Sequence, residues 1–199
     1  MNQYLLLLIS LPALVFPQSP IDSLLQIINT SKEDTTLYNA YLKLGNLFQN
    51  SNPDTAIYYH TQAQKIAGRI PGADGELKVA EALLQKGWDY FIKSEYPIAL
   101  SLSDSAMKIV EKHIDNKNES ISTKAKRIYA SCLGSIGVVY KNQGDYAKAL
   151  DYYFKALKVF EEIGDKQRQA SNLNNIGNVF KNQGDYAKAL DYYFKALKI

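Results

Sequence analysis

Apolar residues recur with a helical period near the end of the chain. Between Tyr146 and Leu157 they fall at i, i+3, i+4, i+7, i+10 and i+11, which is one face of a 3.6-residue helix. Gly144 and Asp145 come directly before this run and favour a break, because glycine ends helices and aspartate caps the next one. Apolar positions upstream predict a preceding helix. We therefore predict a helix, a short turn and a second helix that runs from 146 to 163. The upstream positions are Leu133, Ile136, Gly137 and Tyr140.

The chain contains a repeat of this unit. Residues 141–158 read KNQGDYAKALDYYFKALK, and residues 181–198 read the same at an offset of 40. A duplication is the only reasonable source of such identity. Repeats of this length predict stacked units that bury a continuous core.

The repeated residues resemble the signature of the tetratricopeptide repeat. That signature has a glycine, an aromatic residue three positions later, and then an Ala-x-x-x-aromatic element. Four glycines of this chain have an aromatic residue at the third following position. The matching sets are Tyr41, Leu44, Gly45, Phe48, Ala56, His60 and Ala63; Leu83, Lys86, Gly87, Tyr90, Ala99, Ser103 and Ala106; Leu133, Ile136, Gly137, Tyr140, Ala149, Tyr153 and Ala156; and Leu173, Ile176, Gly177, Phe180, Ala189, Tyr193 and Ala196.

The resemblance implies an all-α fold, a right-handed α-solenoid of antiparallel helix pairs with about four repeats, the last incomplete. Small residues are expected where two helices of a pair cross closely. The predicted division is a signal peptide over 1–18, a capping helix over 19–32, repeats over 33–70 and 75–114, a polar loop over 115–124, and repeats over 125–166 and 167–199.

The amino terminus begins with an uncharged apolar run from Tyr4 to Phe16. It is shorter than the roughly 20 residues that a membrane-spanning helix needs, and its length suits the core of a secretory signal peptide. A buried apolar helix is the alternative. Residues 21–45 also resemble the segment that follows the signal peptide in exported bacterial tetratricopeptide proteins. We therefore expect an exported protein, periplasmic or secreted, or one tethered to the membrane as part of a longer protein.

Composition and charge narrow the class of protein. Apolar residues make up 46% and charged residues 22% of the chain, as in ordinary globular proteins. The net charge of +3 is too small to indicate a nucleic-acid partner. Nine of the 15 tyrosines fall within the repeat frame, so the high tyrosine content reflects aromatic packing positions that recur in each repeat.

No set of catalytic residues emerges from the sequence. His60 occupies an aromatic position of the repeat and is predicted to be a packed core residue, while His113 is expected near a helix end. Cys132, the one cysteine, is predicted to be buried, and it cannot form an intrachain disulfide. We predict that the protein is not an enzyme and holds neither a metal nor a cofactor.

The resemblance implies a concave groove lined by the first helix of each repeat. Asparagine offers both a donor and an acceptor, so a row of asparagines suits the backbone of an extended peptide. The alternatives are that the asparagines are merely soluble surface residues and that a neighbouring segment covers Trp88, Phe91 and Ile92. A complete carboxylate-clamp set is not present. The predicted groove residues are Asn39, Asn46, Gln49, Asn50, Trp88, Phe91, Lys141, Asn142, Asn172, Asn174, Asn178, Lys181 and Asn182, with Leu42, Ala82, Leu84, Ser131, Gly134 and Val138 at further groove positions.

Ile199 falls within the second helix of the fourth repeat, so we expect a truncated chain or a piece of a longer one. Leu190, Tyr193, Phe194 and Leu197 would then present apolar surface, and self-association through this end is the alternative.

These features favour a non-catalytic module that binds a peptide or protein in its groove. Two other hypotheses remain. The chain is the amino-terminal sensory region of a signalling protein, such as a histidine kinase, a nucleotide cyclase or a transcription regulator, or it is a scaffold that only oligomerises.

Overall fold

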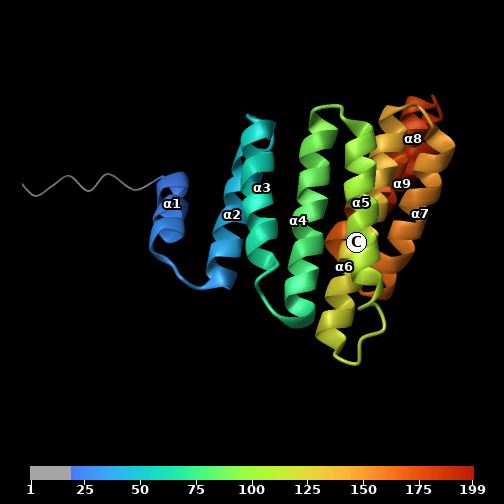
Figure 1. Ribbon diagram of the computed structural model, residues 1–199. Coiled ribbons are helices and arrows are strands. Elements are labelled where there is room, and N and C mark those ends of the chain that lie inside the picture. Colours follow the sequence, from blue (N-terminus) through green and yellow to red (C-terminus); the bar gives the residue numbers. More distant parts are fainter. Residues whose placement is uncertain (1–18) are drawn as a thin grey trace, which may run out of the picture.

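The computed structural model describes residues 19–199, so the predicted signal peptide over residues 1–18 lies outside the described residues. In the described part, nine α-helices follow one another and no strand occurs. Figure 1 shows the helices standing side by side in chain order, from α1 at one end to α7–α9 at the other. Their bounds are α1 Pro20–Thr30, α2 Asp34–Phe48, α3 Pro53–Ala67, α4 Gly72–Ile92, α5 Tyr96–Glu111, α6 Glu119–Asn142, α7 Tyr146–Glu162, α8 Lys166–Asn182 and α9 Tyr186–Leu197.

The helices pack as a solenoid of pairs. Within the repeats α2 packs on α3, α4 on α5, α6 on α7 and α8 on α9. Between repeats α3 packs on α4, α5 on α6 and α7 on α8, while α4 also contacts α6 and α6 contacts α8. The first helices therefore line one side of the array. The all-α fold that the sequence predicts is confirmed.

The helix ends follow the local chemistry that the sequence predicts. Ser19 caps α1 and forms a reciprocal capping box with Asp22, and Asp145 caps α7 through its side chain. Gly144 and Gly184 adopt a φ of 81°, a left-handed conformation in which glycine has no Cβ penalty. Ser94 holds the same place between α4 and α5 with a φ of 61°.

The predicted loop over 115–124 is wrong in its second half. Asn118 accepts hydrogen bonds from the backbone of Ser120 and Ile121, so α6 begins at Glu119. Lys124, on the first two turns of this helix, forms an ion pair with Asp74 of α4 at 3.1 Å. The long spacing between Gly87 and Gly137 therefore reflects a 24-residue first helix as well as a loop.

The small residues of the signature lie in the core. Ala149 and Ala156 of α7 are fully buried, and Gly137 of α6 lies against the ring of Tyr153. Cys132 is also buried, as predicted. Leu190, Phe194 and Leu197 of α9 are exposed, as expected, while Tyr193 of the same helix is half-buried.

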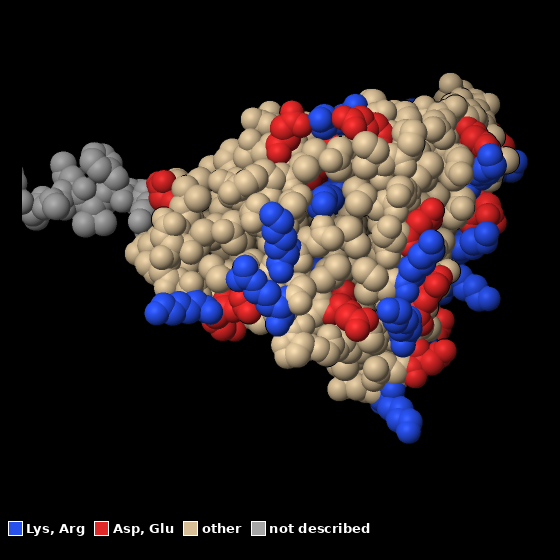
Figure 2. Space-filling model, viewed as in Figure 1, with Lys and Arg blue, Asp and Glu red and all other residues tan. Residues whose placement is uncertain are grey.

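The surface carries charges of both signs. Figure 2 shows lysines and arginines interspersed with aspartates and glutamates, with wide uncharged areas between them. This mixing agrees with the small net charge of +3. Over residues 19–199, no helix combines the length and apolar character that crossing a membrane requires.

Candidate functional site

A hollow of about 910 Å³ lies on the side formed by the first helices. A second hollow of about 230 Å³ shares four of its lining residues and continues it toward α8. We call the two together the groove. The larger part is lined by Gln49, Glu81, Leu84, Gln85, Trp88, Glu119, Ser120, Thr123, Lys124, Arg127, Ile128, Ser131, Ser135 and Arg168, and the smaller adds Gly134, Val138, Phe160, Ser171, Asn172 and Asn175.

The apolar part of the groove centres on Trp88. This half-buried indole lines both hollows, and its ring centroid lies 4.8 Å from that of Phe91. Phe91 in turn lies against Tyr96, at 5.8 Å between centroids. Because Trp88 packs against Phe91, its indole presents a supported apolar surface to the groove. Leu84 and Ile128 extend this surface on α4 and α6.

Two charged side chains of the groove, Glu81 and Lys124, are held by partners outside it. Glu81 accepts a hydrogen bond from the Tyr38 hydroxyl at 2.8 Å. Lys124 is paired with Asp74, which also binds Lys78 at 2.6 Å. Hydrogen bonds from Lys78 lower the pKa of the Asp74 carboxyl, so this carboxylate stays ionised at neutral pH.

The structure brings only some of the predicted groove residues together. Gln49 and Leu84 line the larger hollow, Gly134, Val138 and Asn172 line the smaller one, and Trp88 and Ser131 line both, while Phe91 packs on Trp88. The other predicted residues line neither hollow, and their role in binding stays a prediction. They are Asn39, Asn46, Asn50, Lys141, Asn142, Asn174, Asn178, Lys181 and Asn182.

Two of these asparagines have partners inside the fold. Asn178 accepts a hydrogen bond from the Tyr193 hydroxyl at 2.8 Å, and the Oδ1 of Asn46 lies 3.1 Å from the Nε2 of His60. Both asparagines directly follow the signature glycine, and both partners stand at the aromatic position of the second helix. This explains part of the asparagine row as internal hydrogen bonding.

Sequence reasoning missed several groove residues. It assigned Ala82 to the groove, yet Ala82 is fully buried and its neighbour Glu81 lines the hollow. One residue turns a helix by about 100°, so an error of one position exchanges a core face for a groove face. Arg127 and Arg168 lie well before the signature glycines. Only the length of α6 and the start of α8 place them at the groove.

His60 is buried, as predicted, but its surroundings are polar. Its Nδ1 lies 2.6 Å from the Oδ2 of Asp89, and both side chains are fully buried. Gln49 donates to the other oxygen of Asp89 at 2.9 Å. Asp89 stands two residues after Gly87, where the other repeats have leucine or valine. That departure was the one signal in the sequence for this network.

The histidines and the cysteine of the described residues are buried or paired. No group of three histidine, cysteine, aspartate or glutamate side chains within residues 19–199 is placed to hold a metal ion. Burial raises the pKa of the Cys132 thiol to about 12, so the thiol stays protonated at neutral pH. His113 binds Glu76 at 3.0 Å, close to the end of α5.

The equivalent tyrosines of the two identical segments, Tyr153 and Tyr193, differ in their hydrogen bonding. Within the described residues, the buried hydroxyl of Tyr153 has no hydrogen-bond partner, and burial raises the pKa of this tyrosine. Tyr193 is bound to Asn178, whose counterpart one repeat earlier is Val138. A buried hydroxyl without a partner destabilises the fold, whereas a bonded one contributes.

We therefore expect Tyr153→Phe and Tyr193→Phe to act in opposite directions. Tyr193→Phe should lower the free energy of unfolding by about 1 kcal/mol, and Tyr153→Phe should leave it unchanged or raise it by up to about 1 kcal/mol. Urea unfolding followed by circular dichroism measures both. An equal loss in the two variants would mean that the Tyr153 hydroxyl is bonded after all.

Residues 129–199 match the family model of the tetratricopeptide repeat. This region holds the two best-preserved repeats, and the resemblance inferred from the sequence is confirmed there. No curated protein matches the chain.

Solved structures with a similar fold cover most of the chain. Aspartyl phosphate phosphatase F of Bacillus subtilis superposes with a TM-score of 0.70 at 17% identity, over 86% of this chain and 42% of that protein. The Rap conjugation gene regulator of the plasmid pLS20, solved in complex with a Phr peptide, gives 0.67 at 20% identity, over 87% and 46%. MamA gives 0.51 at 21% identity, over 89% and 85%. The chain thus spans less than half the length of the first two proteins. These likenesses establish a tetratricopeptide-like helical solenoid.

Proposed function

We propose that the protein is a non-catalytic binding module that holds an extended peptide segment of a partner protein in the groove. The observation that carries this proposal is the hollow of about 910 Å³ across α4, α6 and α8, with Trp88 in its lining. Ligand sites in proteins commonly measure about 300–1,000 Å³ and combine an apolar surface with a few polar groups.

The polar lining suits a peptide backbone. Gln49, Gln85 and Ser135 offer donors and acceptors along the groove, while Trp88 and Leu84 offer apolar contact. An extended peptide needs the donors and acceptors because its amide groups lose water when it binds, and its side chains need the apolar contact. The pLS20 regulator, which shares the fold, was solved with a peptide, and this supports the same class of ligand.

The test is to fill the groove without changing its charge. Ser131 lines both hollows, and its hydroxyl donates to the carbonyl of Arg127 one turn earlier at 2.9 Å. Ser105 of α5 makes the same bond to Ser101 at 2.8 Å, is exposed and lines neither hollow. Ser131→Trp and Ser105→Trp therefore form a matched pair.

A phage-displayed library of random nine-residue peptides, selected against the purified protein, supplies the probes. We expect the selected peptides to bind Ser131→Trp at least about tenfold more weakly and Ser105→Trp unchanged, because an indole in the groove displaces the ligand. Circular dichroism controls for folding of both variants. The proposal fails when no peptide is enriched, or when the enriched peptides bind both variants equally.

A further inference from the structure

Two arginines meet at one wall of the groove. Arg127 of α6 donates from Nε to the Oδ2 of Asp165 at 2.9 Å, and Arg168 of α8 donates from a terminal nitrogen to the same oxygen at 2.9 Å. Both arginines line the larger hollow, and Arg168 also lines the smaller one. Their side chains are 40% and 46% exposed, while that of Asp165 is 9% exposed.

Asp165 cannot neutralise both arginines. Its Oδ1 accepts the backbone N–H of Arg168 at 3.2 Å as the cap of α8. Burial alone would raise the pKa of this carboxyl, but the hydrogen bonds from Arg168 and Arg127 outweigh it and lower the pKa. Asp165 is therefore a single negative charge between two positive ones, and the cluster keeps one positive charge in excess.

The remaining donors of the arginines are available to a ligand. Arg127 uses its Nε for Asp165, which leaves the two terminal nitrogens of its guanidinium. Those two nitrogens form a fork that binds both oxygens of a carboxylate. Glu81 and Glu119, the two carboxylates of the lining, form no ion pair among the described residues, and Glu81 is bound to Tyr38.

An apolar surface adjoins this cluster. Trp88 and Arg168 both line the two hollows, so they lie where the hollows join. Ile128 follows Arg127 directly on α6 and also lines the groove. A ligand bound to Arg168 therefore lies in the same part of the groove as the indole of Trp88.

We propose that Arg127 and Arg168 bind a carboxylate of the peptide ligand, next to an apolar side chain of the peptide that packs on Trp88. This inference rests on the proposed function and names its ligand class: a peptide with an aspartate, a glutamate or a free carboxyl terminus beside an apolar residue.

The random nine-residue library tests this inference directly. The best selected peptide is synthesised with its acidic residue, with the corresponding amide, and with an amidated carboxyl terminus, and binding is followed by fluorescence anisotropy. We expect removal of the recognised carboxylate to weaken binding about 10- to 100-fold, as for a charge-assisted hydrogen-bonded pair. The acid-to-amide change and the terminal amidation show which carboxylate is bound.

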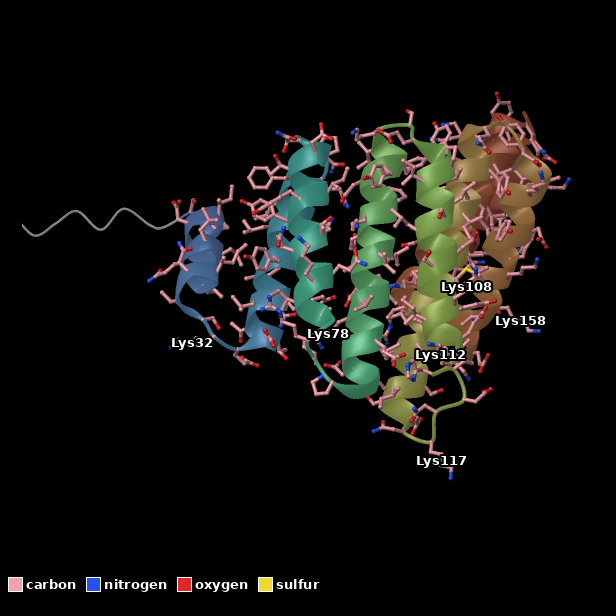
Figure 3. The ribbon with its side chains drawn as sticks, viewed as in Figure 1. Lys32, Lys78, Lys108, Lys112, Lys117 and Lys158 are labelled. Atoms are coloured by element: carbon pink, nitrogen blue, oxygen red, sulfur yellow. The ribbon has the colours of Figure 1, made fainter. Side chains whose placement is uncertain are left out.

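The arginine variants link the effect to the site. The double variant Arg127→Gln/Arg168→Gln should bind the acidic and the amide peptides with equal affinity. Arg127→Lys should keep only part of the preference for the acidic peptide, since lysine lacks the planar fork. Lys158→Gln is the control for net charge, because Lys158 is exposed on α7 and lines neither hollow (Figure 3). It should keep the full discrimination.

The outcomes separate the two proposals. The arginine site is overturned if the selected peptides need the groove but show no preference for a carboxylate. It is also overturned if the preference for a carboxylate persists in the double arginine variant. Both outcomes leave the proposed function intact. An equal loss in Lys158→Gln also overturns the site, because the effect is then one of overall charge. Absence of any peptide sensitive to Ser131→Trp overturns the proposed function itself.

Discussion

Asp89→Ala is expected to lower the free energy of unfolding by about 2–4 kcal/mol, because it removes the shared partner of two side chains in a buried polar network. His60 and Asp89 are both fully buried, and the substitution leaves the Nδ1 of His60 without its partner at 2.6 Å. Gln49 loses its acceptor at the same time. Because His60 belongs to α3 and Asp89 to α4, the loss falls on the contact between the first two repeats. Urea unfolding at neutral pH, followed by circular dichroism, measures the change.

The chain offers a matched control and a rescue for this variant. Asp104→Ala removes an exposed carboxylate of α5 and should change stability by less than about 0.5 kcal/mol. The equivalents of His60 and Asp89 two interfaces later are Tyr153 and Val179, which share an apolar cluster. The double variant His60→Tyr/Asp89→Val should therefore recover most of the lost stability, since replacing both partners of a buried polar pair by groups of fitting shape costs little. A double variant no more stable than Asp89→Ala would show that the pair is not the source of the loss.

Gly137→Ala should lower the free energy of unfolding by about 1–3 kcal/mol, as overpacking does. A Cβ at this position would lie 2.7 Å from Cε1 and 2.8 Å from Cδ1 of the Tyr153 ring. The ring is fully buried, so it has no free space into which to move. The signature glycine is thus required by the close approach of α6 and α7.

Gly134→Ala, three residues earlier on the same helix, should have the opposite sign. A Cβ there would meet no other atom within 4 Å. Alanine favours the helix interior over glycine, so we expect a gain of about 0.5–1 kcal/mol. Thermal and urea unfolding of the two variants compare them directly. Destabilisation by both substitutions would contradict the assignment of Gly137 to a tight helix crossing.

Much of the fold follows from the sequence because its determinants are local and repeated. The apolar period and the Gly144–Asp145 break each involve residues within about four positions, and the structure has both. The loop over 115–124 was mispredicted because polar residues alone do not exclude a helix. Asn118 caps it, and an ion pair between Lys124 and Asp74, 50 positions apart, holds its first turns.

The groove was less predictable because it depends on which helix faces meet. The signature identified Trp88 and Gln49, which stand one and four positions after the signature glycines of their repeats. It gave no reason to select Arg127 or Arg168, since their meeting at Asp165 requires the long α6 to reach the start of α8. The asparagines were selected for their chemistry, yet Asn46 and Asn178 have partners within the fold.

The identical segments 146–157 and 186–197 separate what the sequence determines from what the tertiary structure decides. Both form helices capped by an aspartate and preceded by a glycine at a φ of 81°, because hydrogen bonds and steric limits within one turn depend only on nearby residues. Their side chains differ: Leu157 is 9% exposed and Leu197 is 79% exposed. The Tyr193 hydroxyl has a partner in Asn178, while the residue at the corresponding position of the Tyr153 repeat is Val138, which offers no side-chain acceptor. Burial and hydrogen-bond partners depend on the helix that packs across from each side chain, and only the tertiary structure supplies that helix.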